Sequence, residues 1–178
     1  MQPCYPNGID VSVWQGDITT ALVDCEFACA RASIGNSVDH TYVAHAAAIR
    51  KAGLVLGAYH YLVPSETGTI QVNTFLKSAS DADFFALDME STALKVPKIA
   101  EWFISYLRKI DTRHRKILLY SSEGTWPGDM GQDANWVAKW STTEPAIRWK
   151  FWQYQGAPLD KDVYNGSLAE LKKFVGVK

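Results

Sequence analysis

The sequence lacks the features that mark several large classes of protein. No apolar run approaches the roughly 18 residues that a membrane span requires, so we expect no membrane partner. The first residues, MQPCYPNG, carry neither the basic nor the apolar segment of a secretion signal. Lysine and arginine number 18 against 19 aspartates and glutamates, so no positive excess points to a nucleic-acid partner.

Cysteine is scarce, and its spacing excludes the common structural metal sites. Cys4, Cys25 and Cys29 are the three cysteines, and no second pair completes a zinc motif. Their odd number favours free thiols in a reducing compartment, with a bridge from Cys4 to one of the others as the alternative. Because no metal-binding cluster or glycine-rich phosphate loop is present, we expect no metal and no cofactor.

Aromatic residues, by contrast, are abundant. They make up 12% of the 178 residues and include seven Trp and eight Tyr. Such side chains fill cores and also provide flat faces on which sugars stack. No repeat, low-complexity tract or linker divides the chain, so we expect a single domain over residues 1–178.

Apolar runs alternate with helical patterns through the first two thirds of the chain, which predicts parallel βα units. The links after 135–140 are short and carry no helical pattern, which favours antiparallel strands there. We therefore predict an α/β fold: an incomplete, irregular TIM-like (β/α) barrel, with helices mainly around the N-terminal two thirds and antiparallel last strands. Strands are expected at 8–14, 26–35, 54–63, 83–90, 116–122, 135–140, 149–155 and 162–164, and helices at 40–52, 72–79, 97–110 and after Ser167.

The stretch DFFALDME, residues 83–90, is the centre of the functional prediction. It reads as a buried strand that ends in two carboxylates, Asp88 and Glu90. Residues i and i+2 of a strand share a face, so the two acids should point the same way, with Cα atoms about 6.6 Å apart. One of them should then hold a proton near neutral pH, as a glycosidase requires. This spacing does not decide between retention and inversion at the sugar.

Other candidate side chains lie at the ends of later strands. As a set they predict a wall on which a sugar could stack: Tyr120, Trp136, Trp152 and Gln153. Trp126, in the Gly- and Pro-rich loop GTWPGDMGQDA, is the expected exposed aromatic and a candidate for a distal subsite. His60 is more typical of a hydrogen-bonded core residue than of a catalytic base.

Several segments resemble, in order, the motifs of glycoside hydrolase family 25 lysozymes. These are the N-acetylmuramidases of phage endolysins and of some bacterial and fungal secreted enzymes. The similar segments span about residues 8–174 and read GIDVSVWQG, RASIG followed by Asp39, AGLVLGAYHY, ALDME, ILLYSS, NWVAKW, FWQYQ and DKDVYNGS. Within AYHY, Tyr59 matches the lining of the family's cleft and is expected to contact substrate.

The resemblance also implies roles for the acids. Glu90 matches the family's general acid, and Asp88 matches the partner that orients or stabilises the substrate N-acetyl group. Asp10 in GIDVS matches the cleft acid of the first strand. Asp160 matches the late acid of the family, and Asp162 is its rival, because Lys161 stands where the family has an apolar residue.

The implied activity is hydrolysis of the β-1,4 bond between N-acetylmuramic acid and N-acetylglucosamine in peptidoglycan. The expected partners are bacterial peptidoglycan glycan strands, acted on by a monomer made in a bacterial cytoplasm without a signal peptide and active on the wall after release. Two alternatives stay open. A family 18 chitinase-like barrel would share Asp83, Asp88 and Glu90, but Ala86 stands where that motif has an Asp. A catalytically silent wall-binding module is the other.

Overall fold

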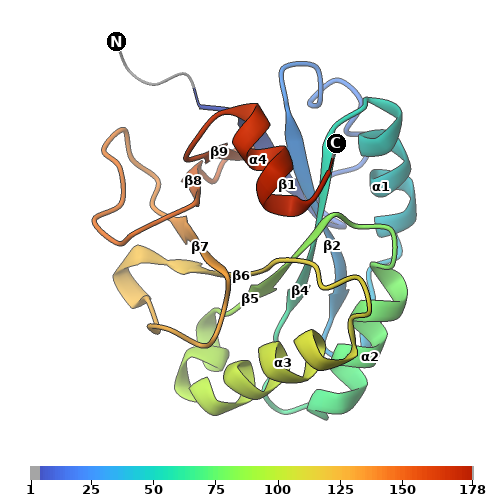
Figure 1. The fold of residues 1–178 in the computed structure, drawn as a ribbon, viewed down its shortest axis with the longest axis vertical. Coiled ribbons are helices and arrows are strands. Elements are labelled where there is room, and N and C mark those ends of the chain that lie inside the picture. The colour runs from blue at the N-terminus through green and yellow to red at the C-terminus, as the bar shows by residue number, and fades with distance from the viewer. Residues whose placement is uncertain (1–4, 178) are drawn as a thin grey trace.

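A computed structural model describes residues 5–177 of the chain. Within them, nine strands form one sheet, which closes into a barrel because β1 pairs with both β2 and β9 (Figure 1). Around the barrel the order is β1-β2-β4-β5-β6-β7-β8-β9, and the short β3 is appended to β2. The strands are β1 Asn7–Val11, β2 Phe27–Ile34, β3 Ser37–Val38, β4 Val55–Tyr61, β5 Phe84–Asp88, β6 Ile117–Ser122, β7 Ala134–Ala138, β8 Phe151–Gln155 and β9 Asp160–Tyr164.

Strand direction follows from the length of the links. Neighbouring strands are parallel from β1 round to β8, and β9 is antiparallel to both β8 and β1. The link 156–159 is too short for a parallel return, whereas 139–150 reaches the dozen or so residues that a crossover needs. The predicted irregular TIM-like α/β barrel with an antiparallel last strand is confirmed. The prediction of antiparallel pairing directly after β7 is wrong, because β8 runs parallel to β7. Within the closed ring only β9 pairs antiparallel, and the appended β3 is antiparallel to β2.

The helices cover the barrel unevenly, as the sequence predicted. They are α1 Tyr42–Lys51, α2 Gly68–Ser78, α3 Pro97–Ile110 and α4 Leu168–Val175, with 3₁₀ turns at Ser91–Lys95 and Glu123–Thr125. The first three lie outside the strands of the N-terminal part, and α4 lies across one end of the barrel (Figure 1). The predicted capping box of α4 is present, since the side chains of Ser167 and Glu170 each accept a hydrogen bond from the other residue's backbone N–H.

Alternation along β5 separates two cores. Phe85 and Leu87 face outward and join the core beneath the helices, whereas Phe84 and Ala86 face into the barrel. Near α4 the barrel interior is packed with aromatic rings and closed by the side chains of Leu171 and Val175. Gly57 lacks a side chain where the Phe84 ring passes, since a Cβ there would lie 2.4 Å from a ring carbon.

Three smaller sequence predictions can be placed in the fold. His60 is fully buried between Ser33 Oγ at 2.8 Å and Gln71 Oε1 at 3.0 Å, which confirms it as a hydrogen-bonded core residue. Cys25 and Cys29 are free thiols, and Cys4 lies outside the described residues. None of the helices within residues 5–177 has the length and apolar character of a membrane span.

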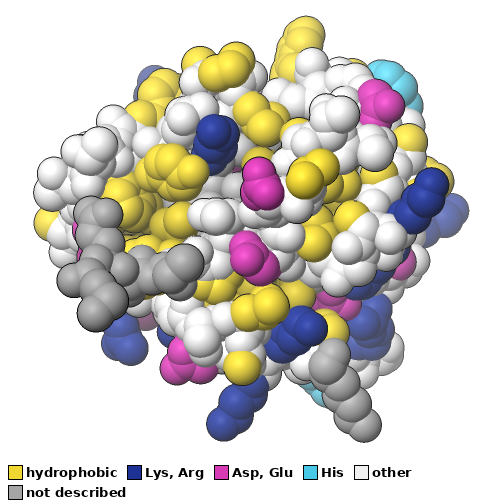
Figure 2. Space-filling view, turned by 90° about the horizontal axis from the view of Figure 1, so that it is seen from above, with side chains coloured by type: hydrophobic (Ala, Val, Ile, Leu, Met, Phe, Trp, Pro, Cys, Tyr) yellow, Lys and Arg dark blue, Asp and Glu magenta, His cyan; other side chains and the backbone are white. Residues whose placement is uncertain are grey.

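Figure 2 shows one face of the molecule, seen from above relative to Figure 1. Acidic and basic side chains are interspersed there among hydrophobic ones, and neither sign forms a continuous patch. This view agrees with the near balance of 18 basic and 19 acidic residues in the sequence.

Candidate active site

A cavity of about 240 Å³ opens at the carboxyl ends of the parallel strands, opposite the end that α4 closes. In TIM-like barrels this is the end at which active sites form. The lining residues come from β1, β2, β4 to β9 and the loops that follow them: Asp10, Ser12, Trp14, Arg31, Tyr59, Tyr61, Asp88, Glu90, Tyr120, Trp136, Trp140, Gln153 and Asp160.

Strand β5 delivers the central pair of acids. The inward alternation of Phe84 and Ala86 continues to Asp88 and, just beyond the strand, to Glu90. The two carboxyl groups therefore line the same cavity, as their spacing predicted. Asp88 is 7% exposed, and its Oδ1 has no hydrogen-bond partner among the described residues, while Glu90 is half-buried. One acid is thus fixed deep in the cavity and the other stands at its mouth.

Burial and mutual repulsion change the ionisation of this pair. Burial, followed by the negative charges of Glu90 and Asp10, raises the pKa of Asp88 well above its usual value, and Arg31 opposes that rise. Burial also raises the pKa of Glu90, against hydrogen bonding with Tyr120 and Asp88. Two adjacent carboxyls that interact in this way hold one proton between them near neutral pH. The pair can therefore supply both an acid and a carboxylate.

The first and last strands add further acids beside this pair. Asp10 and Asp160 are register partners across the β1–β9 seam. Burial and then Asp160 raise the pKa of Asp10 to about 7, and burial and then Glu90 raise the pKa of Asp160 to about 6. Of the two late candidates, Asp160 lines the cavity, whereas Asp162 is fully buried and accepts a hydrogen bond from Trp136 Nε1 at 2.7 Å.

Gln153 links three walls of the cavity through one amide. Its Oε1 accepts hydrogen bonds from the Tyr120 hydroxyl at 2.9 Å and from Trp140 Nε1 at 3.0 Å. Its Nε2 donates to Asp10 Oδ2 at 2.7 Å. Because both donors meet the amide oxygen, the amide NH₂ must face Asp10. Gln153, predicted as a substrate contact, is 2% exposed and orients the groups around it.

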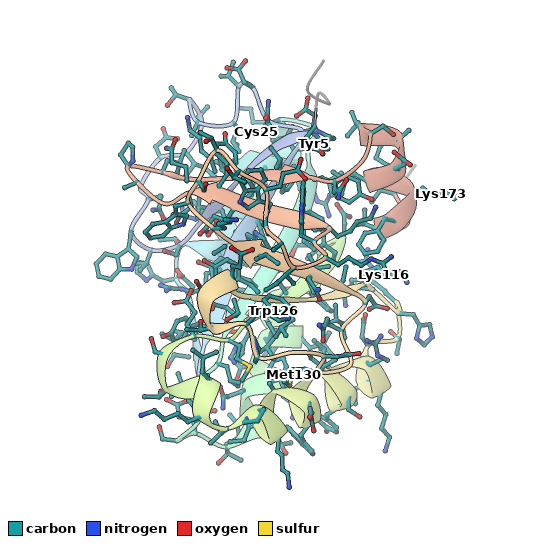
Figure 3. The ribbon with its side chains drawn as sticks, turned by 90° about the vertical axis from the view of Figure 1, so that its left-hand side faces the viewer. Tyr5, Cys25, Lys116, Trp126, Met130 and Lys173 are labelled. Atoms are coloured by element: carbon teal, nitrogen blue, oxygen red, sulfur yellow. The ribbon has the colours of Figure 1, made fainter. Side chains whose placement is uncertain are left out.

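Two predicted aromatic contacts lie elsewhere. Trp152 precedes Gln153 on β8, so its side chain points out of the barrel, packs against Trp149 and Val163, and does not line the cavity. Trp126 is half-buried on the flank of the barrel, near Met130 and α3 (Figure 3). It is not among the residues that line the cavity. The alternation rule could have excluded Trp152 from the sequence alone, because Trp152 and Gln153 cannot face the same side.

Sequence reasoning missed several lining residues. Trp14 and Trp140 are 84% and 70% exposed at the rim, so these, and not Trp126, are the exposed tryptophans of the site. Arg31 also lines the cavity. It lies two residues after Cys29, which faces into the barrel on β2, so the alternation of side chains along the strand could have predicted this position. Each tryptophan is the last residue of a predicted strand, 8–14 or 135–140, and this position at a strand end was the available signal.

A second cavity, of about 510 Å³, lies on the other side of Glu90. It shares Glu90, Tyr120 and Trp140 with the first, and we call it the outer lobe. Its remaining lining is Ser91, Leu94, Ser122, Thr125, Ala138 and Lys139. Glu90 thus stands between an acidic cavity and a lobe of small hydroxyl and apolar side chains. Within residues 5–177, no group of His, Cys, Asp and Glu is arranged to hold a metal ion.

A TIM-like barrel with several carboxyl groups of raised pKa at its carboxyl rim, walled by aromatic rings, is the arrangement of a glycoside hydrolase. The chain belongs to the glycosyl hydrolases family 25, whose family model matches residues 9–163.

Curated relatives cover nearly the whole chain. The uncharacterized protein YegX of Escherichia coli O6:H1 is 30% identical across 97% of this chain and 74% of its own length. Lysozyme M1 of Streptomyces globisporus is 28% identical across 93% of this chain and 69% of its own length.

Solved structures show the same fold at low identity. The catalytic domain of endolysin ply40, from bacteriophage P40 of Listeria monocytogenes, superposes with a TM-score of 0.84 at 23% identity, covering 99% of this chain and 100% of that domain. A family 25 glycosyl hydrolase from Bacillus anthracis superposes with a TM-score of 0.81 at 22% identity, covering 98% of this chain and 95% of that one.

Proposed function

We propose that this protein is a lysozyme that hydrolyses the β-1,4 bond between N-acetylmuramic acid and N-acetylglucosamine in bacterial peptidoglycan. The observation that carries the proposal is that Asp88 and Glu90 share one cavity, in which burial raises the pKa of both. Membership of family 25 and the likeness to lysozyme M1 support the choice of substrate. The site of action is then the cell wall, where that polymer lies.

Glu90 is the general acid in this proposal. It stands between the acidic cavity and the outer lobe, where a bond between two sugars would lie, and it is the more exposed of the pair. Its proton passes to the glycosidic oxygen as the bond from that oxygen to C1 breaks. Water then adds to C1, and the proton that it loses returns to a carboxylate of the cluster.

Asp88 is the carboxylate that assists. Positive charge develops on C1 and the ring oxygen of the sugar that occupies the acidic cavity. A fixed, buried carboxylate stabilises that charge directly, or through the N-acetyl group that it orients. Arg31 opposes the rise in the pKa of Asp88. When a sugar occupies the cavity, its developing positive charge favours the ionised form of Asp88 and leaves the proton of the pair on Glu90. Asp10 and Asp160 add negative potential on the same side.

The test is to digest purified peptidoglycan, reduce the products with borohydride, and identify the new ends by mass spectrometry. We expect reduced muramic acid at the new ends. Reduced glucosamine ends would contradict the proposal, because they mark the other glycosidic bond. Faster release from chitin than from peptidoglycan would favour the chitinase-like alternative, and wall binding without new reducing ends would favour the silent module.

A further inference from the structure

The acidic cavity contains one charged side chain that neither donates the proton nor stabilises the positive charge on the sugar. Among its described lining residues, Arg31 is the one with a positive charge. Its side chain is 13% exposed and projects from β2 where the pairing with β4 shifts register between Arg31 and Ser33. A cation beside a centre that develops positive charge is unfavourable for the reaction unless it also binds the substrate.

One edge of this guanidinium is already held. Arg31 Nε donates to Asp39 Oδ2 at 2.8 Å, and the Asp39 side chain is 1% exposed. Asp39 also accepts hydrogen bonds from Val13 N at 3.2 Å and from Thr41 N and Oγ1. The Arg31 side chain is therefore fixed to both the β1 loop and the start of α1.

The two terminal nitrogens of Arg31 remain available. They form no hydrogen bond within residues 5–177, although the residue lines the cavity. An arginine fixed at Nε presents these nitrogens as a fork suited to a carboxylate or a carbonyl oxygen. The other ionisable groups of the cavity are carboxyls and tyrosines, so an acidic substituent has one place to bind.

The outer lobe, unlike the acidic cavity, offers no unpaired positive charge among its described lining residues. Lys139, its one lysine, pairs with Glu123 at 3.1 Å and donates to Glu144 O at 3.0 Å. Trp140 is fixed there by its hydrogen bond to Gln153 and by contact with Gly156, where a Cβ would lie 2.2 Å from the indole ring. A rigid, exposed indole beside small hydroxyls suits an uncharged sugar face.

We propose that these two sides fix the direction of the glycan strand, with Arg31 binding the lactyl carboxyl group of muramic acid in the acidic cavity and the leaving N-acetylglucosamine lying on Trp140 in the outer lobe. The inference rests on the proposed lysozyme activity. It follows from the position of the carboxyl groups, which gather on the side of Glu90 where charge develops and so locate the sugar that is attacked.

The test compares two substrates of equal length. One is glycan strands freed of peptide, which carry lactyl carboxylates, and the other is the same strands with those carboxyls reduced to alcohols. We expect wild type to favour the carboxylate strands by about tenfold in kcat/KM, the value of a charge-assisted hydrogen bond. Arg31→Met should remove this preference, and Arg31→Lys should keep part of it.

Trp140→Leu is the matched control. It should lower kcat/KM on both strands by a similar factor and leave their ratio unchanged, because the sugar it contacts has no lactyl group. Equal wild-type rates on the two strands would overturn the inference, and this outcome needs no variant to fold. A ratio that Arg31→Met leaves intact, or that Trp140→Leu abolishes, would also overturn it. Absence of muramic acid ends from wild type would instead reject the lysozyme activity.

Discussion

The two halves of the barrel interior are built on the same strands but have opposite chemistry. Toward α4, the inward positions hold Phe27, Phe84 and Phe151, whose rings pack edge to face or tilted at centroid distances of 5.2–5.3 Å. Toward the rim, inward positions of the same barrel hold carboxyl groups, tyrosines and an amide. A few residues along a strand thus separate a stabilising core from a cluster of acids.

The comparison shows how a small barrel can carry a costly site. Burying several carboxyls disfavours their charged forms and leaves atoms such as Asp88 Oδ1 and Asp162 Oδ2 without a hydrogen-bond partner among the described residues. The aromatic half offsets that cost through buried apolar area. Changes in the acidic half should therefore affect activity, and changes in the aromatic half should affect stability.

The largest difference between the effect on activity and the effect on stability is expected for a change at Glu90. Glu90→Gln should lower hydrolysis of peptidoglycan by about 10²–10⁴-fold, because in the proposed mechanism it removes the proton donor. Its melting temperature should stay the same or rise, since a buried acid is lost. The release of reducing ends and the thermal unfolding curve measure the two effects. Glu101→Gln, an exposed change on α3, is the control and should retain activity. Wild-type turnover by Glu90→Gln would remove Glu90 from the mechanism.

Phe84 tests the aromatic half. Phe84→Ala should lower the free energy of unfolding by about 3–5 kcal/mol, through lost burial and the cavity that remains. Denaturant unfolding measures this, and activity per folded molecule should change far less than in Glu90→Gln. If Phe84→Ala lost activity with unchanged stability, the aromatic half would not have the purely stabilising role that we assign to it.

The raised pKa of Asp10 should make the stability of the protein depend on pH. Its pKa is raised to about 7 in the fold, first by burial and then by Asp160, against about 3.9 when unfolded. Between about pH 4 and 7 the native state therefore holds a proton that the unfolded state has lost. The stability of wild type should fall through this window relative to Asp10→Asn, by at most about 1.4 kcal/mol per pH unit.

The comparison with Asp10→Asn is needed because other groups titrate in the same range. Burial lowers the pKa of His60 to about 4, which makes stability rise with pH and opposes the effect of Asp10. That contribution is common to wild type and variant and cancels in the difference. Denaturant curves at several pH values give the measurement, and parallel stability profiles for the two proteins would contradict the prediction.

The smallest effect is expected at Trp152, which faces out of the barrel. Trp152→Phe should leave kcat/KM within about twofold and cost about 1 kcal/mol of stability, since it loses the hydrogen bond from Nε1 to Lys139 O at 2.8 Å. Trp136→Phe, on the inward face, should lower activity more, because it removes the donor to Asp162. A larger loss of kcat/KM for Trp152→Phe than for Trp136→Phe would indicate that Trp152 contributes to the site.

Local pattern was enough to predict the barrel and its central acids. Apolar runs broken by helical patterns predicted the βα order, and the i, i+2 spacing placed Asp88 and Glu90 on one face. The β1–β9 seam that joins Asp10 to Asp160 depends on contacts between distant parts of the chain, which spacing cannot supply. The same holds for Trp140, whose orientation depends on a hydrogen bond to another strand.

The pairing of β1 with β9 also determines when, during folding, the candidate site is complete. Asp10 comes from the first strand and Asp160 from the last, and they become neighbours only when the ring of strands shuts. A nascent chain that ends before β9 lacks half of this pair, however well its earlier strands have formed. Under the proposed mechanism, hydrolytic activity should therefore appear only after β9 has been synthesised and has paired with β1.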